Sequence, residues 1–348
     1  MLKINREKLL GCILGGAVGD ALGAPIENLY IDQIRRYNGE NGISGYVEFT
    51  DGKGRITDDT QMTLFTLEGL LAARKFADED NIEGMEIEFV YQSYLHWLLT
   101  QGEPLPDSVS KKYPTLISER LQKERWLYVR RAPGFTCISA LKSGACGTIA
   151  HPLNDSKGCG GVMRIAPVGL LFHDDLEVTF RLGCEVAAIT HGHPSGYLSA
   201  GCLATIIAEL MNGKSLTESV GNSITILKKW PNHAECLQIM ERAVELAESL
   251  PATSENIARL GEGWVGEEAL AIAVFCSLKH QDDFRAGVLA AVNHSGDSDS
   301  TGAIAGNILG ASLGLSAIPT IWIENLNEGK MIKKVIKEFG LFREAVRY

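Results

Sequence analysis

Apolar residues recur at spacings of three and four over most of the chain. In residues 61–76 the apolar positions are Met62, Leu64, Phe65, Leu67, Leu70, Leu71 and Phe76. Similar runs cover residues 86–99, 176–190, 197–211, 234–250, 267–278 and 284–293. This spacing places apolar side chains on one face of a helix. Only residues 45–49 resemble a strand, and that stretch is too short to anchor a sheet. The pattern therefore predicts an all-α fold.

Two stripes of glycine lie near the two ends of the chain. Glycine recurs every four residues at positions 11, 15, 19 and 23, and again at 302, 306, 310 and 314. On a helix, each stripe forms a ridge without side chains. An internal glycine destabilises a helix by roughly 0.5–1 kcal/mol relative to alanine, so a close contact must offset the loss. We predict that both segments are core helices that lie near each other.

The remaining segments indicate one domain with long loops. No linker, charge block or repeat divides the chain, so we expect a single domain over residues 1–348. Residues 31–55 are polar and rich in glycine, and residues 130–164 contain six glycines. Long loops inside compact domains are often functional. We expect a mobile loop or lid at about residues 27–56.

The charge and cysteine content indicate which kinds of partner and which cellular compartment to expect. The chain has 33 basic and 43 acidic residues, a net charge of -10 and no basic tract, which argues against nucleic-acid binding. It has no run of ~20 uninterrupted apolar residues, so we expect no membrane span. Its eight scattered cysteines indicate reduced thiols in a cytoplasmic protein. Residues 9–18, which follow three basic residues, resemble a signal peptide, but three glycines break the apolar run.

Two acidic motifs each precede a predicted helix. Asp58 and Asp59 lie between two threonines, and Asp297 and Asp299 lie among hydroxyl residues before the second glycine stripe. Either motif alone fits a helix cap, since Asp and Thr favour N-terminal positions. Together they suggest a cation site. An EF-hand is excluded because the twelfth position of its loop requires a bidentate Glu, and here that position is Ile308. Oxygen ligands without a nearby His or Cys partner favour Mg²⁺ or Mn²⁺, and four aspartates can hold two ions.

Five ordered motifs carry a family resemblance. They are G-D-A-L-G-A-P-I-E at 19–27, T-D-D-T at 57–60, G-C-G-G-V-M-R-I-A-P at 158–167, T-H-G-H-P at 190–194 and G-D-S-D-S-T-G at 296–302. In this combination the chain resembles the ADP-ribosylglycohydrolase family over about residues 8–315. The resemblance implies an all-helical fold with two Mg²⁺ or Mn²⁺ ions, and an enzyme that removes ADP-ribose from modified side chains.

The resemblance also implies roles for individual residues. The metal ligands would be Thr57, Asp58, Asp59, Asp297, Asp299 and Ser300. Glu27 would lie beside the metals and act in catalysis with Asp58 and Asp59, although an exposed surface carboxylate is the alternative. Some members carry Thr where this chain has Ser300, and the Ser form resembles the arginine-directed branch. Cleavage at C1″ of the ribose needs an oriented sugar, a carboxylate and an activated water, which these groups can supply.

A second group of residues is expected to bind the rest of ADP-ribose. The backbone N–H groups of a glycine-rich turn can bind an anion in an acidic protein, and the candidate turn contains Gly158, Cys159, Gly160, Gly161, Val162 and Met163. A plain turn is the alternative. His191 and His193 are candidates for a pocket wall or for a structural pair. Trp264 is a candidate for the same pocket or for core packing. Arg130 and Arg131 face either an anionic ligand or solvent.

The sequence thus favours a hydrolase that removes ADP-ribose from protein arginine. Its expected partners are ADP-ribosylated protein and ADP-ribose. One alternative is another ADP-ribose linkage, to serine or in O-acetyl-ADP-ribose. Another is a binding role, either as an immunity protein that blocks a cognate ADP-ribosyltransferase toxin or as a structural protein on this fold.

Overall fold

The computed structural model describes residues 5–47, 51–80, 84–113, 115–116 and 120–339. Within these ranges the regular structure is helical, with two isolated β-bridges and no strand. The α-helices are α1 (Arg6–Gly23), α2 (Ile31–Asn38), α3 (Asp58–Asp80), α4 (Glu86–Thr100), α5 (Asp107–Lys112), α6 (Phe135–Lys142), α7 (Ala166–Leu171), α8 (Leu176–Ala188), α9 (Pro194–Met211), α10 (Leu216–Leu227), α11 (Ala234–Ser249), α12 (Ser254–Ile257), α13 (Gly266–Lys279), α14 (Phe284–Val292), α15 (Ser298–Leu313), α16 (Thr320–Glu324) and α17 (Gly329–Glu338). The predicted all-α fold is confirmed.

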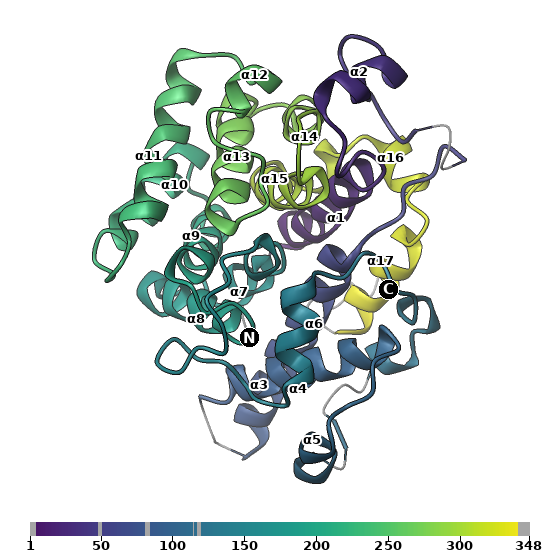
Figure 1. Ribbon diagram of the computed structural model, residues 1–348, viewed down its shortest axis with the longest axis vertical. Helices are drawn as coiled ribbons and strands as arrows, with labels where there is room; N and C mark the ends of the chain where they lie inside the picture. Colours follow the sequence, from purple (N-terminus) through teal and green to yellow (C-terminus); the bar gives the residue numbers. More distant parts are fainter. Residues whose placement is uncertain (1–4, 48–50, 81–83, 114, 117–119, 340–348) are drawn as a thin grey trace, which may run out of the picture.

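Helices α1 and α15 lie side by side at the centre of the fold, although they come from opposite ends of the chain (Figure 1). Their glycine stripes face each other. A Cβ atom added to Gly15 would overlap the backbone oxygen of Gly306, and one added to Gly19 would overlap that of Gly302. Asn307 Nδ2 also donates to the carbonyl of Cys12 at 2.8 Å across the same interface. The predicted close approach of the two striped helices is confirmed.

The seven helices predicted from apolar spacing all form, with ends that shift by a few residues. Most helices that the spacing did not predict are short, and α2 lies inside the segment expected to be a loop. Helix α10 is longer, and a capping box of Ser215 and Glu218 marks its start. The strand-like segment at residues 45–49 forms no strand at 45–47, and 48 and 49 lie outside the described residues.

Two further findings concern the cysteines and the length of the apolar helices. All eight cysteines are free thiols, and six of them are buried. None of the described helices is both long enough and apolar enough to cross a bilayer.

Candidate active site and metal centre

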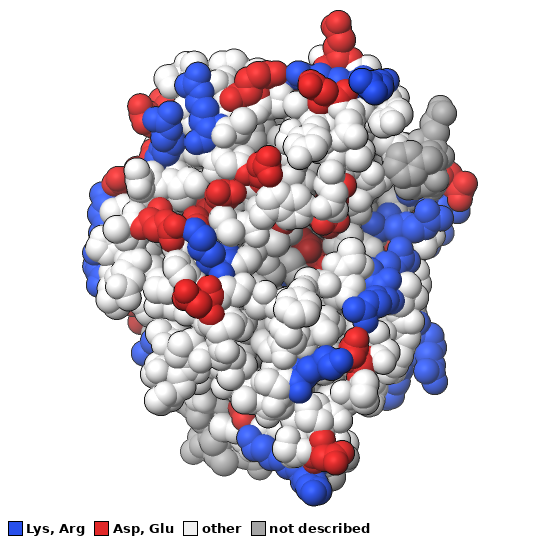
Figure 2. All heavy atoms as spheres, in the orientation of Figure 1, with Lys and Arg blue, Asp and Glu red and all other residues white. Residues whose placement is uncertain are grey.

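The two acidic motifs meet because α1 and α15 pack so closely. Asp58 and Asp59 begin α3, and Asp297 caps the N-terminus of α15, where Asp299 lies in the first turn. All four side chains are at most 4% exposed, and the flanking Thr57 and Ser300 are also buried. Asp299 is close enough for its charge to raise the pKa of both Asp58 and Asp59. Figure 2 shows acidic atoms at the bottom of a hollow near the middle of the face it presents.

Among the described residues, the charges that act most on Asp58 and Asp59 are those of other carboxylates. Burial is the largest cause that raises the pKa of Asp59, and the charges of Asp299, Asp20, Asp58 and Asp297 raise it further. Oδ2 of Asp59 is buried and has no hydrogen-bond partner among the residues that the structure describes. Buried charges are normally paired or coordinate a metal. An orphaned carboxylate oxygen within a cluster of oxygen donors therefore fits a divalent cation.

Glu27 lies at the edge of the same cluster, just after α1. Single carboxylate oxygens of Glu27, Asp297 and Asp299 lie within 4.8 Å of one another. The N–H of Asn28 donates to the carbonyl of Gly296 at 3.4 Å, which holds this segment beside the second acidic motif. Burial and the charge of Asp299 raise the pKa of Glu27 to about 7. Glu27 is thus part of the acidic cluster and is not an isolated surface carboxylate.

Asp20 is a member of the cluster to which the sequence analysis assigned no role. Its side chain is fully buried on α1 and accepts hydrogen bonds from the N–H groups of Thr57 at 3.0 Å and Thr60 at 3.2 Å. Burial and the charge of Asp299 raise its pKa to about 7. A detectable signal existed, since Asp20 is the one acidic residue between the glycines of the first stripe. Asp20 holds the start of α3 against α1.

The alternative of helix capping holds at both motifs alongside the clustering. Thr57 Oγ1 accepts from the N–H of Asp59 at 3.3 Å, and Asp297 Oδ1 accepts from the N–H of Ser300 at the same distance. Asp58 Oδ2 accepts from the N–H of Gly134 at 3.2 Å. Each of these side chains keeps oxygen lone pairs beyond its cap. Capping therefore orients the carboxylates and leaves them lone pairs that can bind a cation.

The glycine loop, residues 158–163, lies against the acidic cluster. Burial, followed by the charge of Asp297, raises the pKa of the Cys159 thiol. Ser300 Oγ lies 4.0 Å from the sulfur of Met163. The N–H groups of Cys159, Val162 and Met163 donate within the protein at 2.9–3.2 Å. The N–H groups of Gly158 and Gly161 also donate within the protein, to Ser156 Oγ at 3.3 Å and to the Gly158 carbonyl at 3.5 Å. We therefore expect the amide of Gly160 to face an anion.

The two candidate histidines make structural contacts around this loop. His191 is buried beneath it, since a Cβ on Gly160 would lie 3.1 Å from His191 Cε1. Burial and the charge of Arg164 lower the pKa of His191 to about 3, so the ring is neutral. His193 caps α9 by accepting from the N–H of Ser195 at 3.1 Å. His191 supports the glycine loop from the inside, and His193 fixes the helix that follows.

The other candidates divide between the site and the surface. Trp264 is 38% exposed, so it is not a core residue, and its carbonyl accepts from the N–H of Cys159 at 3.2 Å. It therefore lies beside the glycine loop. Arg130 pairs with Glu103 at 3.0 Å. Arg131 pairs with Glu328 at 3.3 Å, while its carbonyl accepts from the N–H of Asp58. Both arginines are thus held by carboxylates of the protein.

The fold and the site together describe an all-helical protein with a buried cluster of carboxylates that suits divalent cations. Comparison with known proteins identifies the family. The family model for ADP-ribosylglycohydrolase matches residues 1–347, and the chain belongs to this family. The resemblance seen in the sequence is confirmed. Membership supports hydrolysis of glycosidic bonds of ADP-ribose.

Relatives span nearly the whole chain. An uncharacterized protein of Archaeoglobus fulgidus is 29% identical, with 94% of each chain covered. The ADP-ribosylarginine hydrolase Tri1 of Serratia proteamaculans is 24% identical over 95% of this chain and 78% of its own. The ADP-ribosyl-[dinitrogen reductase] glycohydrolase of Rhodospirillum rubrum is 25% identical, with 92% and 90% covered. A solved structure, described as an ADP-ribosylglycohydrolase-related protein complex, has a TM-score of 0.60 at 23% identity and covers 97% of this chain and 98% of its own.

Proposed function

We propose that this protein hydrolyses the N-glycosidic bond between ADP-ribose and arginine side chains of proteins, with two Mg²⁺ or Mn²⁺ ions. The observation that carries the proposal is the burial of Asp58, Asp59, Asp297 and Asp299 in one cluster with an orphaned carboxylate oxygen. The arginine linkage is supported by the similarity to Tri1, which is named an ADP-ribosylarginine hydrolase. Ser300 in the second motif supports the same branch.

The donor set supports placing the cations at the two motifs. Thr57, Asp58, Asp59, Asp297, Asp299 and Ser300 would hold them, since hard divalent ions prefer carboxylate and hydroxyl oxygens. When bound, the cations supply Lewis-acid chemistry that stabilises negative charge on oxygen. Asp20 stays outside this set because the N–H groups of Thr57 and Thr60 occupy its oxygens.

The position of Glu27 supports a role in proton transfer. It is half-buried at the edge of the cluster, so it faces both the carboxylates and the solvent. In the proposed reaction, water attacks C1″ of the ribose and gives a proton to the Glu27 carboxylate. The bond from C1″ to the arginine nitrogen breaks, and the departing nitrogen takes up the proton that Glu27 gained from the water, so that one water is added across the bond overall.

A panel of substrates tests the proposal. Peptides with ADP-ribose on arginine, serine or cysteine are treated with the enzyme, and mass spectrometry follows release. We expect the fastest release from arginine. Asp297→Asn should abolish most of it, whereas Asp283→Asn, which changes an exposed cap on α14 (3.0 Å to the N–H of Ala286), should not. Faster release from serine, or equal activity of the two variants, would overturn the proposal.

A further inference from the structure

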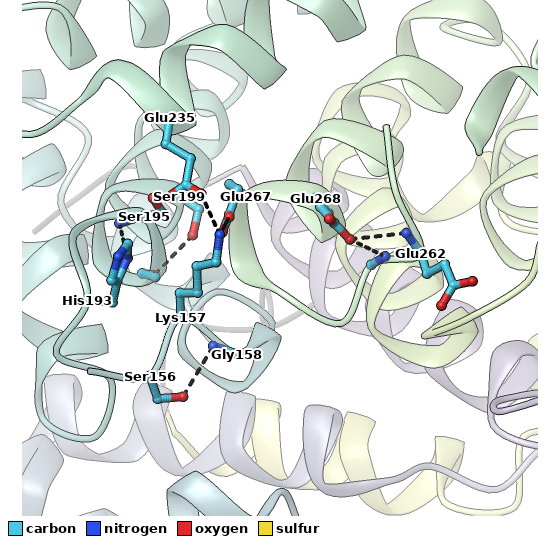
Figure 3. Close-up of polar contacts among 12 residues, drawn as sticks. Ser156, Lys157, Gly158, His193, Ser195, Ser199, Glu235, Glu262, Glu267 and Glu268 are labelled. Atoms are coloured by element: carbon cyan, nitrogen blue, oxygen red, sulfur yellow. Dashed lines mark hydrogen bonds and ion pairs between the residues drawn. The ribbon is translucent and has the colours of Figure 1, made fainter. Parts of the chain in front are cut away.

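Lys157 immediately precedes the glycine loop and is held by two carboxylates (Figure 3). Its Nζ lies 2.5 Å from Oε1 of Glu235 and 2.5 Å from Oε1 of Glu267. Glu235 lies in the first turn of α11 and Glu267 in the first turn of α13. The three side chains therefore connect the glycine loop to the starts of two helices.

The contact with Glu267 is buried. The Glu267 side chain is 3% exposed, and within the described part of the chain its Oε2 has no hydrogen-bond partner. Lys157 is 31% exposed and is the cation that balances this carboxylate. Removing one member of a buried ion pair leaves an uncompensated charge, which is strongly destabilising. The position of Lys157 is therefore tied to that of Glu267.

Backbone contacts hold the same loop against α13. The carbonyl of Lys157 accepts from the N–H of Gly266, the first residue of α13, at 2.7 Å. The adjacent Glu268 accepts from the N–H groups of Glu262 at 3.1 Å and Gly263 at 3.2 Å, in the loop that carries Trp264. Two consecutive glutamates at the start of α13 thus hold the two loops beside the acidic cluster.

We propose that Lys157 is a positioning residue, which fixes the glycine loop for ADP-ribose through Glu267 and Glu235 and does not bind the pyrophosphate itself. Two carboxylates surround one ammonium group, so the group as a whole carries negative charge and does not attract an anion. Lys157 instead holds in place the loop in which the Gly160 amide is expected to face the anion. This inference rests on the proposed function in taking that loop as the site for ADP-ribose.

Glu267→Gln distinguishes a positioning role of Lys157 from direct contact with phosphate, because the two roles predict opposite changes in the Kd for ADP-ribose. If Lys157 positions the loop, Lys157→Gln and Glu267→Gln should each raise the Kd for ADP-ribose about tenfold, the loss that a charged hydrogen bond represents. The double variant should bind no more weakly than either single one, because both act through one contact. The KM for ADP-ribosylated peptide should rise while kcat changes less than twofold. Tighter binding by Glu267→Gln would show that the freed ammonium contacts phosphate, and would overturn the proposal.

A measurement without ligand keeps this inference separate from the proposed function. Hydrogen–deuterium exchange at residues 158–163 of the free protein should be faster in Lys157→Gln than in the wild type. The control is Lys229→Gln, which breaks a surface ion pair of the same length, 2.5 Å to Glu177. Unchanged exchange in Lys157→Gln would overturn the positioning role. Faster exchange in a protein whose wild type does not bind ADP-ribose would support it and reject the proposed function instead.

Discussion

Single carboxylates in this protein differ in what surrounds them. Asp20 and Asp59 both lie in the acidic cluster, yet Asp20 accepts several hydrogen bonds while one oxygen of Asp59 accepts none. A carboxylate whose lone pairs are filled by N–H donors is structural, whereas one left bare in a negative cluster is suited to a cation. The hydrogen bonds therefore support different roles for Asp20 and Asp59, which residue type alone leaves open.

Glu27→Gln should impair turnover more than metal binding. Glutamine keeps the shape of the side chain but cannot accept the proton from the attacking water. We expect kcat on arginine-linked substrate to fall by about a hundredfold or more, a usual contribution of a general base, while the affinity for Mg²⁺ stays near that of the wild type. Single-turnover kinetics and calorimetry measure the two quantities. An unchanged kcat would make Glu27 a bystander.

His191 gives the protein an acid-sensitive stability. Burial and Arg164 lower its pKa to about 3 in the folded state, against about 6.5 when unfolded. The unfolded state therefore binds more protons between these values, and stability falls as the pH falls through that window. From pH 7.5 to pH 5, His191 should cost about 2 kcal/mol.

His191→Asn should remove this part of the pH dependence. Urea unfolding of wild type and variant at both pH values gives the comparison. The loss of stability between pH 7.5 and pH 5 should be smaller in the variant, whatever its absolute stability. An equal loss in both proteins would mean that His191 is able to ionise in the folded state.

At the scale of elements, most of the longer helices and the pairing of α1 with α15 could be predicted from the sequence, and the loops could not. Apolar spacing identifies a helix that is long enough to show several repeats, so α3, α4 and α9 were predictable. Short helices such as α5 and α12 show too few repeats. The contacts of Trp264 and Lys157 depend on how loops meet across the fold, and no local pattern encodes such contacts.

The facing glycines of α1 and α15 should tolerate no side chain. In Gly15→Leu and Gly306→Leu the new side chain would overlap the backbone of the opposite helix. Because a backbone cannot rotate away as a side chain can, we expect a loss of about 3 kcal/mol or more in each variant. The control is Gly221→Leu on α10, where the added group would meet open space. Thermal unfolding measures all three, and wild-type stability in the first two would contradict the packing.

For the whole molecule, the site depends on contacts between segments distant in sequence. The start of α3 and the start of α15 are some 240 residues apart in the chain, and the pairing of α1 with α15 brings them together. Two motifs that each fit an ordinary cap become one acidic cluster only in the fold. The members of the acidic cluster could therefore be predicted from the sequence, except that Asp20 was given no role. That one oxygen of Asp59 lacks a hydrogen-bond partner among the described residues could be seen only in the structure.

The most direct test of this account is calorimetric titration of the chelated protein with Mg²⁺ and Mn²⁺. The chelated protein should keep its far-ultraviolet circular dichroism, because the apolar core does not depend on the cluster, but it should not hydrolyse substrate. Wild type should bind both ions, and Ca²⁺ should restore activity poorly because of its larger radius. Asp297→Asn should lose at least one ion, and Asp283→Asn should bind like wild type. The absence of divalent-ion binding in the wild type, or full activity in chelator, would contradict the account and leave both motifs as helix caps.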